Sequence, residues 1–134
     1  MSLAVIQSQE KAFSPDQTTM ELMHVPVDSF ETPARDGISV TLGGLGLIQV
    51  GRDKDSQRIA SVWMEGVSGQ VIRNRLRRVL EESLESLARK KSSAEIKTHW
   101  AGFGQLLEAE SHFSLVQLGM EFIGFLPDGR AESS

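Results

Sequence analysis

Apolar residues recur with a helical period over residues 67–91, and this is the clearest pattern in the chain. Seven apolar positions fall on one side of a 3.6-residue repeat that no proline interrupts: Val71, Ile72, Leu76, Val79, Leu80, Leu84 and Leu87. Ser68 is suited to the N-cap, and Lys90 and Lys91 place positive charge at the negative end of the helix dipole. We therefore expect one long amphipathic helix with a single buried face.

Alternating apolar and polar residues predict strands on both sides of this helix. Residues 38–42 alternate strictly, and residues 45–50 continue the extended pattern beyond two glycines, Gly43 and Gly44. The polar run over 51–57 predicts a turn, so residues 45–64 are expected to form a hairpin. Further strands are expected over 96–100, 112–118 and 120–126, with Gly119 as a bulge or corner.

Residues 1–37 contain three of the four prolines, Pro15, Pro26 and Pro33, and this composition predicts an irregular arm. Within the arm, Ser14-Pro15-Asp16-Gln17 has the pattern of a capping box and predicts a short helix from Pro15 to about His24. Met20 and Met23 would lie on the apolar side of that helix, which must dock either on its own domain or on a partner.

Together these patterns predict an α+β fold. A mostly antiparallel sheet of about four to six strands would pack against one long amphipathic helix. The 134 residues suit a single domain, which we place over 38–129, after the N-terminal arm over 1–37 and before a frayed tail over 130–134.

Composition excludes several kinds of chemistry. Without cysteine, the chain cannot form disulfides, thiolate metal sites or thiol nucleophiles. A net charge of −4 argues against a protein that coats nucleic acid or anionic membrane through its overall field. No stretch approaches about 18 consecutive apolar residues, and the N-terminal residues lack a signal-peptide pattern. We therefore expect no membrane span and a cytoplasmic protein from a bacterium.

Charge is segregated along the predicted long helix. Four arginines precede three glutamates, in the order Arg73, Arg75, Arg77, Arg78, Glu81, Glu82 and Glu85. This order opposes compensation of the helix dipole in the first half. The arginines could contact phosphate or nucleic acid over Arg73–Arg78, or an acidic protein partner. We favour a solvated face on which Arg77 and Arg78 pair with glutamates four residues later, because no aromatic residues interleave with the arginines.

A weak metal-ligand pattern lies further along the chain. Glu108, Glu110 and His112 alternate, so on a strand their side chains would share one face, and His99 from a neighbouring strand could join them. Carboxylates and imidazoles in this number can hold a divalent metal. In a loop or at a helix end the three side chains would diverge, and the same pattern also arises on the polar face of an edge strand.

Other catalytic patterns are missing. The run Gly43-Gly44-Leu45-Gly46 has neither the lysine of a P-loop nor the spacing of a dinucleotide-binding loop, and no nucleophile elbow occurs in the chain. The glycines are better explained by a bend in a sheet. We expect no cofactor, and the balance of evidence from the sequence is against an enzyme.

The order of strand, glycine turn, Leu45-Gly46, hairpin and long Arg- and Leu-rich helix resembles the C-terminal domain of flagellar hook-length and type III needle-length control proteins. The similarity covers about residues 38–98, lacks the proline expected before Leu45, and leaves the β-rich segment 112–126 without a place. It implies a protein-binding regulator associated with secretion.

The sequence therefore predicts a non-catalytic protein-binding module, such as an adaptor, secretion-associated regulator, chaperone or immunity-type protein, with a second copy as the simplest partner in a homodimer. The candidate partner-binding residues are Met20, Met23, Arg73, Arg77 and Arg78. One alternative is a metal-binding protein or metal-dependent enzyme, and the other is a nucleic-acid-binding protein.

Overall fold

The computed structural model describes residues 22–128 and the backbone of residues 132–133. In these residues an antiparallel sheet has the strand order β1 (Met23–Pro33), β2 (Ser39–Val50) and β3 (Met120–Pro127). The two-residue strand β4 (Glu132–Ser133) pairs with the start of β2. Between β2 and β3 the described chain forms four α-helices, α2 (Lys54–Met64), α3 (Gly69–Lys90), α4 (Ser93–Thr98) and α5 (Phe103–Gln117), and one 3-10 turn, η1 (Trp100–Gly102).

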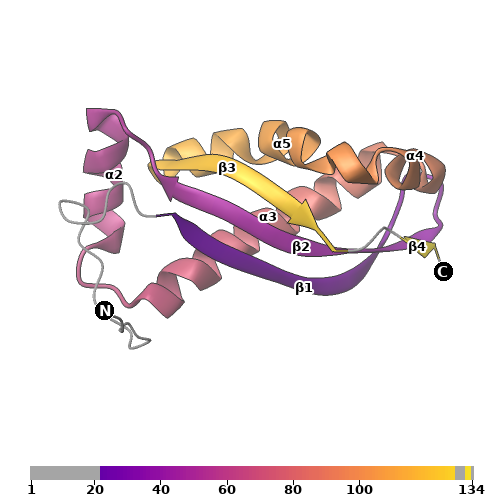
Figure 1. The fold of residues 1–134 in the computed structure, drawn as a ribbon, viewed down its shortest axis with the longest axis horizontal. Helices are drawn as coiled ribbons and strands as arrows, with labels where there is room; N and C mark the ends of the chain where they lie inside the picture. The colour runs from indigo at the N-terminus through magenta and orange to yellow at the C-terminus, as the bar shows by residue number, and fades with distance from the viewer. Residues whose placement is uncertain (1–21, 129–131, 134) are drawn as a thin grey trace.

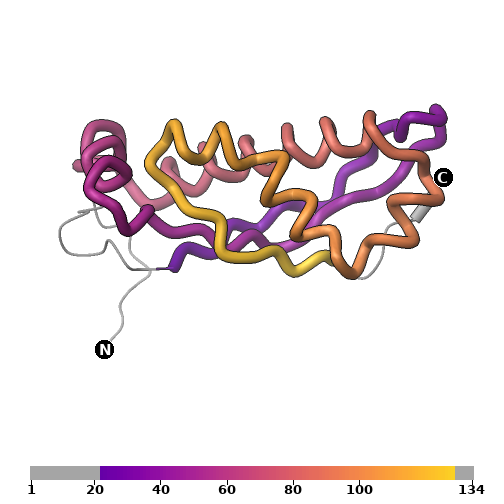
Figure 2. The backbone as a smooth tube through the Cα atoms, turned by 90° about the horizontal axis from the view of Figure 1, so that it is seen from above, coloured from indigo at the N-terminus to yellow at the C-terminus, as the bar shows by residue number. Residues whose placement is uncertain are grey.

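The sheet and the two longest helices form two layers. Figure 1 looks onto the sheet, with α3 behind it and α5 along its β3 edge, and Figure 2 shows α3 on one side of the strands. Helix α3 packs against β1, and α5 packs against both β3 and α3. The core lies between the layers and includes Val25, Val27, Leu42, Ile48 and Phe125 from the sheet, and Leu76, Leu80, Leu84, Phe103 and Leu107 from the helices.

The alternation over 38–50 determines which side chains of β2 are buried. Val40, Leu42, Ile48 and Val50 are fully buried, whereas most residues between them are partly exposed. The predicted strand is therefore confirmed and continues through the glycines as one element. A Cβ atom at Gly46 would overlap Leu80 Cδ1, so glycine at this position allows α3 to approach the strand closely.

Helix α3 is the helix that the 3.6-residue pattern predicts. Ser68 Oγ accepts a hydrogen bond from Val71 N at 3.3 Å, as expected for an N-cap. However, the expectation of a sheet of four to six strands against one helix is wrong. The described sheet has three strands and the short β4, and three further α-helices accompany α3. Segments with strand-favouring residues are helical, for reasons that differ from one segment to the next.

Residues 54–64 form α2 and not the second strand of a hairpin. The Asp53 carboxylate caps this helix by accepting hydrogen bonds from Ser56 N (3.0 Å) and Ser56 Oγ (2.7 Å). Ala60 and Met64, four residues apart, are both fully buried. The cap and the helical spacing of the buried side chains outweigh the strand preference of the β-branched and aromatic residues in the segment.

The strand predicted over 96–100 is also wrong, since residues 93–98 form α4. A capping box begins this helix: Glu95 N donates to Ser92 Oγ (3.1 Å), and Ser92 N donates to Glu95 Oε1 (2.8 Å). Trp100 then begins the 3-10 turn, and its ring lies 4.9 Å from that of Phe103. Serine followed three residues later by glutamate was the signal for this helix start.

Residues 112–117 belong to α5, whereas the sequence predicted a strand over 112–118. The buried side chains of α5 recur every four residues, at Phe103, Leu107, Ser111 and Leu115. Gly119 follows the helix with a φ of 73°, the left-handed conformation that commonly ends helices, and is therefore not a bulge in a strand. The strand predicted over 120–126 is confirmed as β3.

Residues 23–33, which we expected within an irregular arm, form β1 and pair with β2. An edge strand accommodates Pro26 and Pro33, because the missing N–H groups need no partner on the open side. Met23 and His24 therefore lie on a strand rather than on the predicted short helix. The remainder of that helix, with Met20, lies outside the described residues. In the tail expected to be frayed, residues 132–133 pair with β2.

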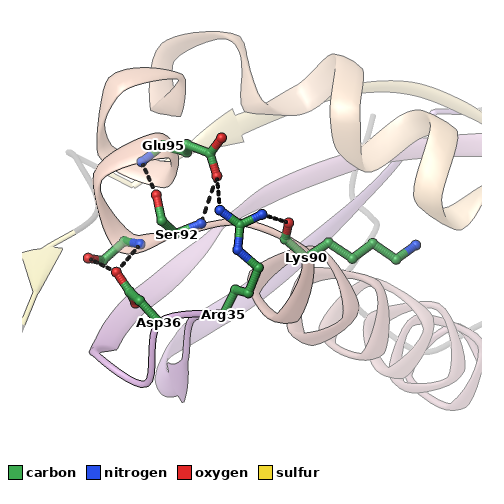
Figure 3. A network of polar contacts seen from close by, with 6 residues as sticks. Arg35, Asp36, Lys90, Ser92 and Glu95 are labelled. Atoms are coloured by element: carbon green, nitrogen blue, oxygen red, sulfur yellow. Dashed lines mark hydrogen bonds and ion pairs between the residues drawn. The ribbon is translucent and has the colours of Figure 1, made fainter.

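The turn between β1 and β2 is fastened to the junction between α3 and α4 (Figure 3). Arg35 donates through Nη1 to Lys90 O (3.0 Å) and through Nη2 to Glu95 Oε1 (3.2 Å). Asp36 Oδ2 accepts hydrogen bonds from Ser93 N (3.1 Å) and Ser93 Oγ (2.9 Å). These contacts join residues more than fifty positions apart and hold the helix layer against one end of the sheet.

Candidate interaction surface on helix α5

Helix α5 carries side chains of apolar type on two opposite sides. The inner side packs into the core through the buried residues spaced four apart. The outer side carries Leu106, Ala109, Phe113 and Val116, a set that we call the α5 stripe. At about 100° per residue, the centres of the two sets lie nearly opposite each other around the helix axis. A surface helix ordinarily presents mainly polar residues on its outer side, whereas α5 carries these four among exposed polar residues such as Gln105 and Gln117.

The α5 stripe is exposed at its centre. Phe113 is 71% exposed and Val116 is 45% exposed, while Ala109 is exposed and Leu106 is half-buried. The residues are three, four and three positions apart, which is the spacing of apolar residues in paired helices. A single exposed apolar side chain is ordinary, but an ordered set on one helix indicates a surface that binds another protein element.

One flank of the stripe is held against α3 through Glu110. Ser86 Oγ donates to this carboxylate, and Lys90 Nζ donates to its two oxygens at 2.9 and 3.0 Å. Desolvation raises the pKa of Glu110, but these hydrogen bonds and the charges of Lys90 and Arg89 outweigh it, so the pKa is lowered. The contacts fix α5 against α3 and therefore fix the direction in which the stripe faces.

The other flank opens onto a cleft of about 410 Å³ between α5, β3 and the start of α2. Its walls include the apolar residues Leu115, Val116, Met120 and Phe122, and its ionisable residues are Arg52, Asp53, Glu108, His112 and Glu121. Arg52 Nη2 lies 3.4 Å from Glu121 Oε2. The volume falls in the range of small-ligand sites, and Val116 belongs to both the stripe and the cleft.

The structure does not bring the predicted metal ligands together. Because these residues lie on a helix, Glu110 faces α3, whereas Glu108 and His112 line the cleft on the other flank. His99 is the C-cap of α4, beyond the opposite end of α5. At about 1.5 Å per residue, Phe103 and His112 alone are roughly 13 Å apart along the helix. Within the described ranges no three histidine or acidic side chains form a cluster suited to a metal ion.

The arginines of α3 have separate local contacts. Arg77 Nε lies 3.8 Å from Glu81 Oε2, which confirms one of the ion pairs predicted from the sequence. The guanidinium of Arg75 lies 5.3 Å from the ring centroid of Trp63 on α2, a cation–π contact. Arg75 is therefore directed toward α2 rather than toward a patch shared with the other arginines.

The remaining candidate residues also differ in their surroundings. Arg73 Nη2 donates to Gln70 Oε1 at 3.4 Å, while Arg78 is exposed to solvent. Met23 is half-buried and pairs with Ile48 in the sheet. Met20 lies outside the described residues.

A second apolar surface lies on the face of the sheet opposite the helices, which faces the viewer in Figure 1. Pro26, Leu45 and Leu126 are aligned across the three strands by the strand register. Leu126 is 58% exposed, and Leu45 is half-buried. This row contains three residues, one fewer than the α5 stripe, and the pairing of the strands is sufficient to explain why they lie together.

The sequence analysis does not identify the α5 stripe, because it predicts a strand over residues 112–118 and not a helix. A signal was present in the spacing of 106, 109, 113 and 116. A second set at 103, 107, 111 and 115 overlaps it, so apolar or small residues occur all around the helix and conceal the usual one-sided period.

Comparison with known proteins finds no family model that matches this chain and no curated protein that matches it. The resemblance to length-control proteins loses its basis, because residues 54–64 form a helix where that resemblance requires half of a hairpin. Among the described residues, no helix combines the length and the apolar character needed to cross a bilayer.

Proposed function

We propose that this chain is a non-catalytic protein-binding module, of the kind represented by adaptors, secretion-associated regulators, chaperones and immunity-type proteins, and that it associates with itself. The α5 stripe is the observation that carries the proposal. Phe113 is 71% exposed on a helix that α3 and β3 hold in place. Burying such a side chain in a partner contributes about 1.5–3 kcal/mol, and rigid aromatic residues commonly dominate binding energies.

Two polar pairs at the neighbouring cleft make structural contacts. The Ser56 hydroxyl donates to Asp53 as part of the α2 cap, and Glu121 is paired with Arg52. Both pairs hold parts of the fold in place, and we assign no catalytic role to them. We extend the proposal to the cytoplasmic location and the bacterial source that the sequence favours.

Affinity capture tests the role of the stripe directly. The tagged wild type, a Phe113→Ser variant and a Val62→Ser control would be isolated from the cells that produce the chain. Val62 is 83% exposed on α2, so its substitution removes an exposed apolar side chain outside the stripe. We expect wild type and Val62→Ser to retain the same proteins, including further copies of the chain, and Phe113→Ser to lose them.

Circular dichroism must first show that the three proteins melt at the same temperature, since both substituted positions are exposed. Equal retention by wild type and Phe113→Ser would contradict the proposal. A wild type that is monomeric in light scattering and retains no protein would also contradict it.

A further inference from the structure

The α5 stripe has the same spacing in both directions along the helix. Leu106 and Val116 lie five residues on either side of Ser111, and Ala109 and Phe113 lie two residues on either side. A twofold axis across the helix at the level of Ser111 therefore places Leu106 opposite Val116 of a second copy. The same axis places Ala109 opposite Phe113 of that copy. The stripe is self-complementary in position, as an interface between identical subunits requires.

The opposed side chains are also complementary in size. Phe113 is the largest residue of the stripe and Ala109 is the smallest, so each phenylalanine meets the space beside an alanine. Large side chains packed over small ones let two helices approach closely. Leu106 and Val116 are two aliphatic side chains of similar volume, and the spacing of three, four and three residues suits helices that cross at a small angle.

Charges beside the stripe do not oppose this arrangement. The axis brings the same flank of both copies together, so on the cleft flank each Glu108 lies about 3 Å along the axis from His112 of the second copy. On the α3 flank the two Glu110 carboxylates lie about 3 Å apart along the axis, and each accepts hydrogen bonds from Lys90 Nζ of its own chain, which offsets their repulsion.

From this symmetry we infer that the α5 stripe binds the α5 stripe of a second copy of this chain, with the two helices antiparallel about a twofold axis that passes the outer side of α5 at the level of Ser111. The inference rests on the proposed function, because it names the partner of the same surface. A helix of 15 residues is about 22 Å long, so the contact is small and the dimer is reversible.

Exchanging the large and small residues provides the first test. Sedimentation velocity from about 1 to 500 μM would compare wild type with Phe113→Ala, Ala109→Phe and the Ala109→Phe/Phe113→Ala double variant. Phe113→Ala removes the large partner, and Ala109→Phe places two large side chains opposite each other. Each single change should raise the dimer dissociation constant at least about tenfold, and the double variant should return within about threefold of wild type.

The absence of cysteine from the sequence makes a second test possible. Leu106→Cys and Val116→Cys variants would be oxidised separately and as an equal mixture. In the antiparallel arrangement each cysteine lies about 15 Å along the axis from its own equivalent, too far for a disulfide. The mixture should therefore form a covalent dimer, and neither variant alone should.

A wild type that remains monomeric over the whole concentration range would overturn the inference. A double variant as weak as the single variants, or cross-linking of one cysteine variant by itself, would do the same. The capture experiment distinguishes this failure from that of the proposed function. A monomeric chain that binds a different protein through Phe113 keeps the protein-binding part of the proposed function and rejects its self-association, and with it the second copy as partner.

Discussion

The indole nitrogen of Trp63 donates a hydrogen bond to the carbonyl oxygen of Leu118, 2.8 Å away. This bond joins α2 to the residue that ends α5, and the guanidinium of Arg75 from α3 lies over the same indole ring. Three helices therefore meet at one side chain. Because α2 and α5 both line the cleft, the Trp63 contact also holds two of the cleft walls together.

Replacing Trp63 with phenylalanine should keep an aromatic ring at this junction and remove its hydrogen-bond donor. The Leu118 carbonyl would lose its indole partner, and we expect the free energy of unfolding to fall by about 1–3 kcal/mol. Urea denaturation followed by circular dichroism measures the change. Val62→Ser, at the exposed residue next to Trp63, provides the control and should change the free energy of unfolding by less than about 0.5 kcal/mol. A Trp63→Phe variant as stable as wild type would show that this hydrogen bond makes no net contribution to the free energy of unfolding.

Substituting Gly46 with alanine tests the close approach between β2 and α3. The added methyl group would overlap Leu80 Cδ1, so the leucine must leave its preferred position. Overpacking of this kind costs about 1–3 kcal/mol. Gly102→Ala is a matched control, because a Cβ atom there meets no heavy atom within 4 Å. If thermal denaturation gave the same melting temperature for both variants, the packing explanation for Gly46 would be rejected.

The capping box of α4 predicts a measurable loss for Ser92→Ala. Removing the hydroxyl deprives Glu95 N of its acceptor, and such changes cost about 1 kcal/mol. Ser114→Ala, at an exposed position inside α5, serves as the comparison and should stay within about 0.5 kcal/mol of wild type. Guanidinium titration of both variants gives the two values. Equal values would indicate that the box does not stabilise the folded state.

Acid should weaken the fold partly through Asp36. Desolvation raises the pKa of this carboxyl group, but hydrogen bonds from Ser93 N, Ser93 Oγ and Ile38 N outweigh it and lower the pKa below 3.8. A carboxyl group with a depressed pKa stabilises the folded state above its unfolded pKa. That contribution is lost as pH falls through the folded pKa.

We therefore expect the stability of wild type to decline below about pH 5, and that of Asp36→Asn to decline less. Urea titrations at several pH values between about 2 and 7 give, for both proteins, the slope of the free energy of unfolding against pH. Asp28→Asn, an exposed change on β1, controls for the loss of one carboxylate, and its slope should follow wild type. Identical slopes for Asp36→Asn and wild type would assign the acid sensitivity to other groups.

Elements with one strong period could be predicted from the sequence. Helix α3 has a single apolar face and a serine cap, and β2 alternates between buried and partly exposed residues over much of its length. In both, the local pattern and the buried face agree, so no distant contact is needed to choose between helix and strand.

The other helices were mistaken for strands for identifiable reasons. In α2 the β-branched and aromatic residues suggested a strand, while Asp53 and Ser56 carried the cap signal. In α4 the Ser92 and Glu95 box was present but the segment is only six residues long. In α5 two overlapping apolar sets concealed the period, and with it the candidate surface. Local residue preferences differ by small energies, which caps and burial readily exceed.

The α+β class, the long helix α3 and the central strand β2 follow from the sequence, because the side chains that these elements bury are spaced by their own backbone geometry. The packing of the whole chain, in contrast, sets α5 with one side toward the core and the other toward solvent. It also turned Glu110 toward Lys90 and away from His112. Such outcomes depend on contacts between residues far apart in the chain, and these contacts form only when the whole core packs.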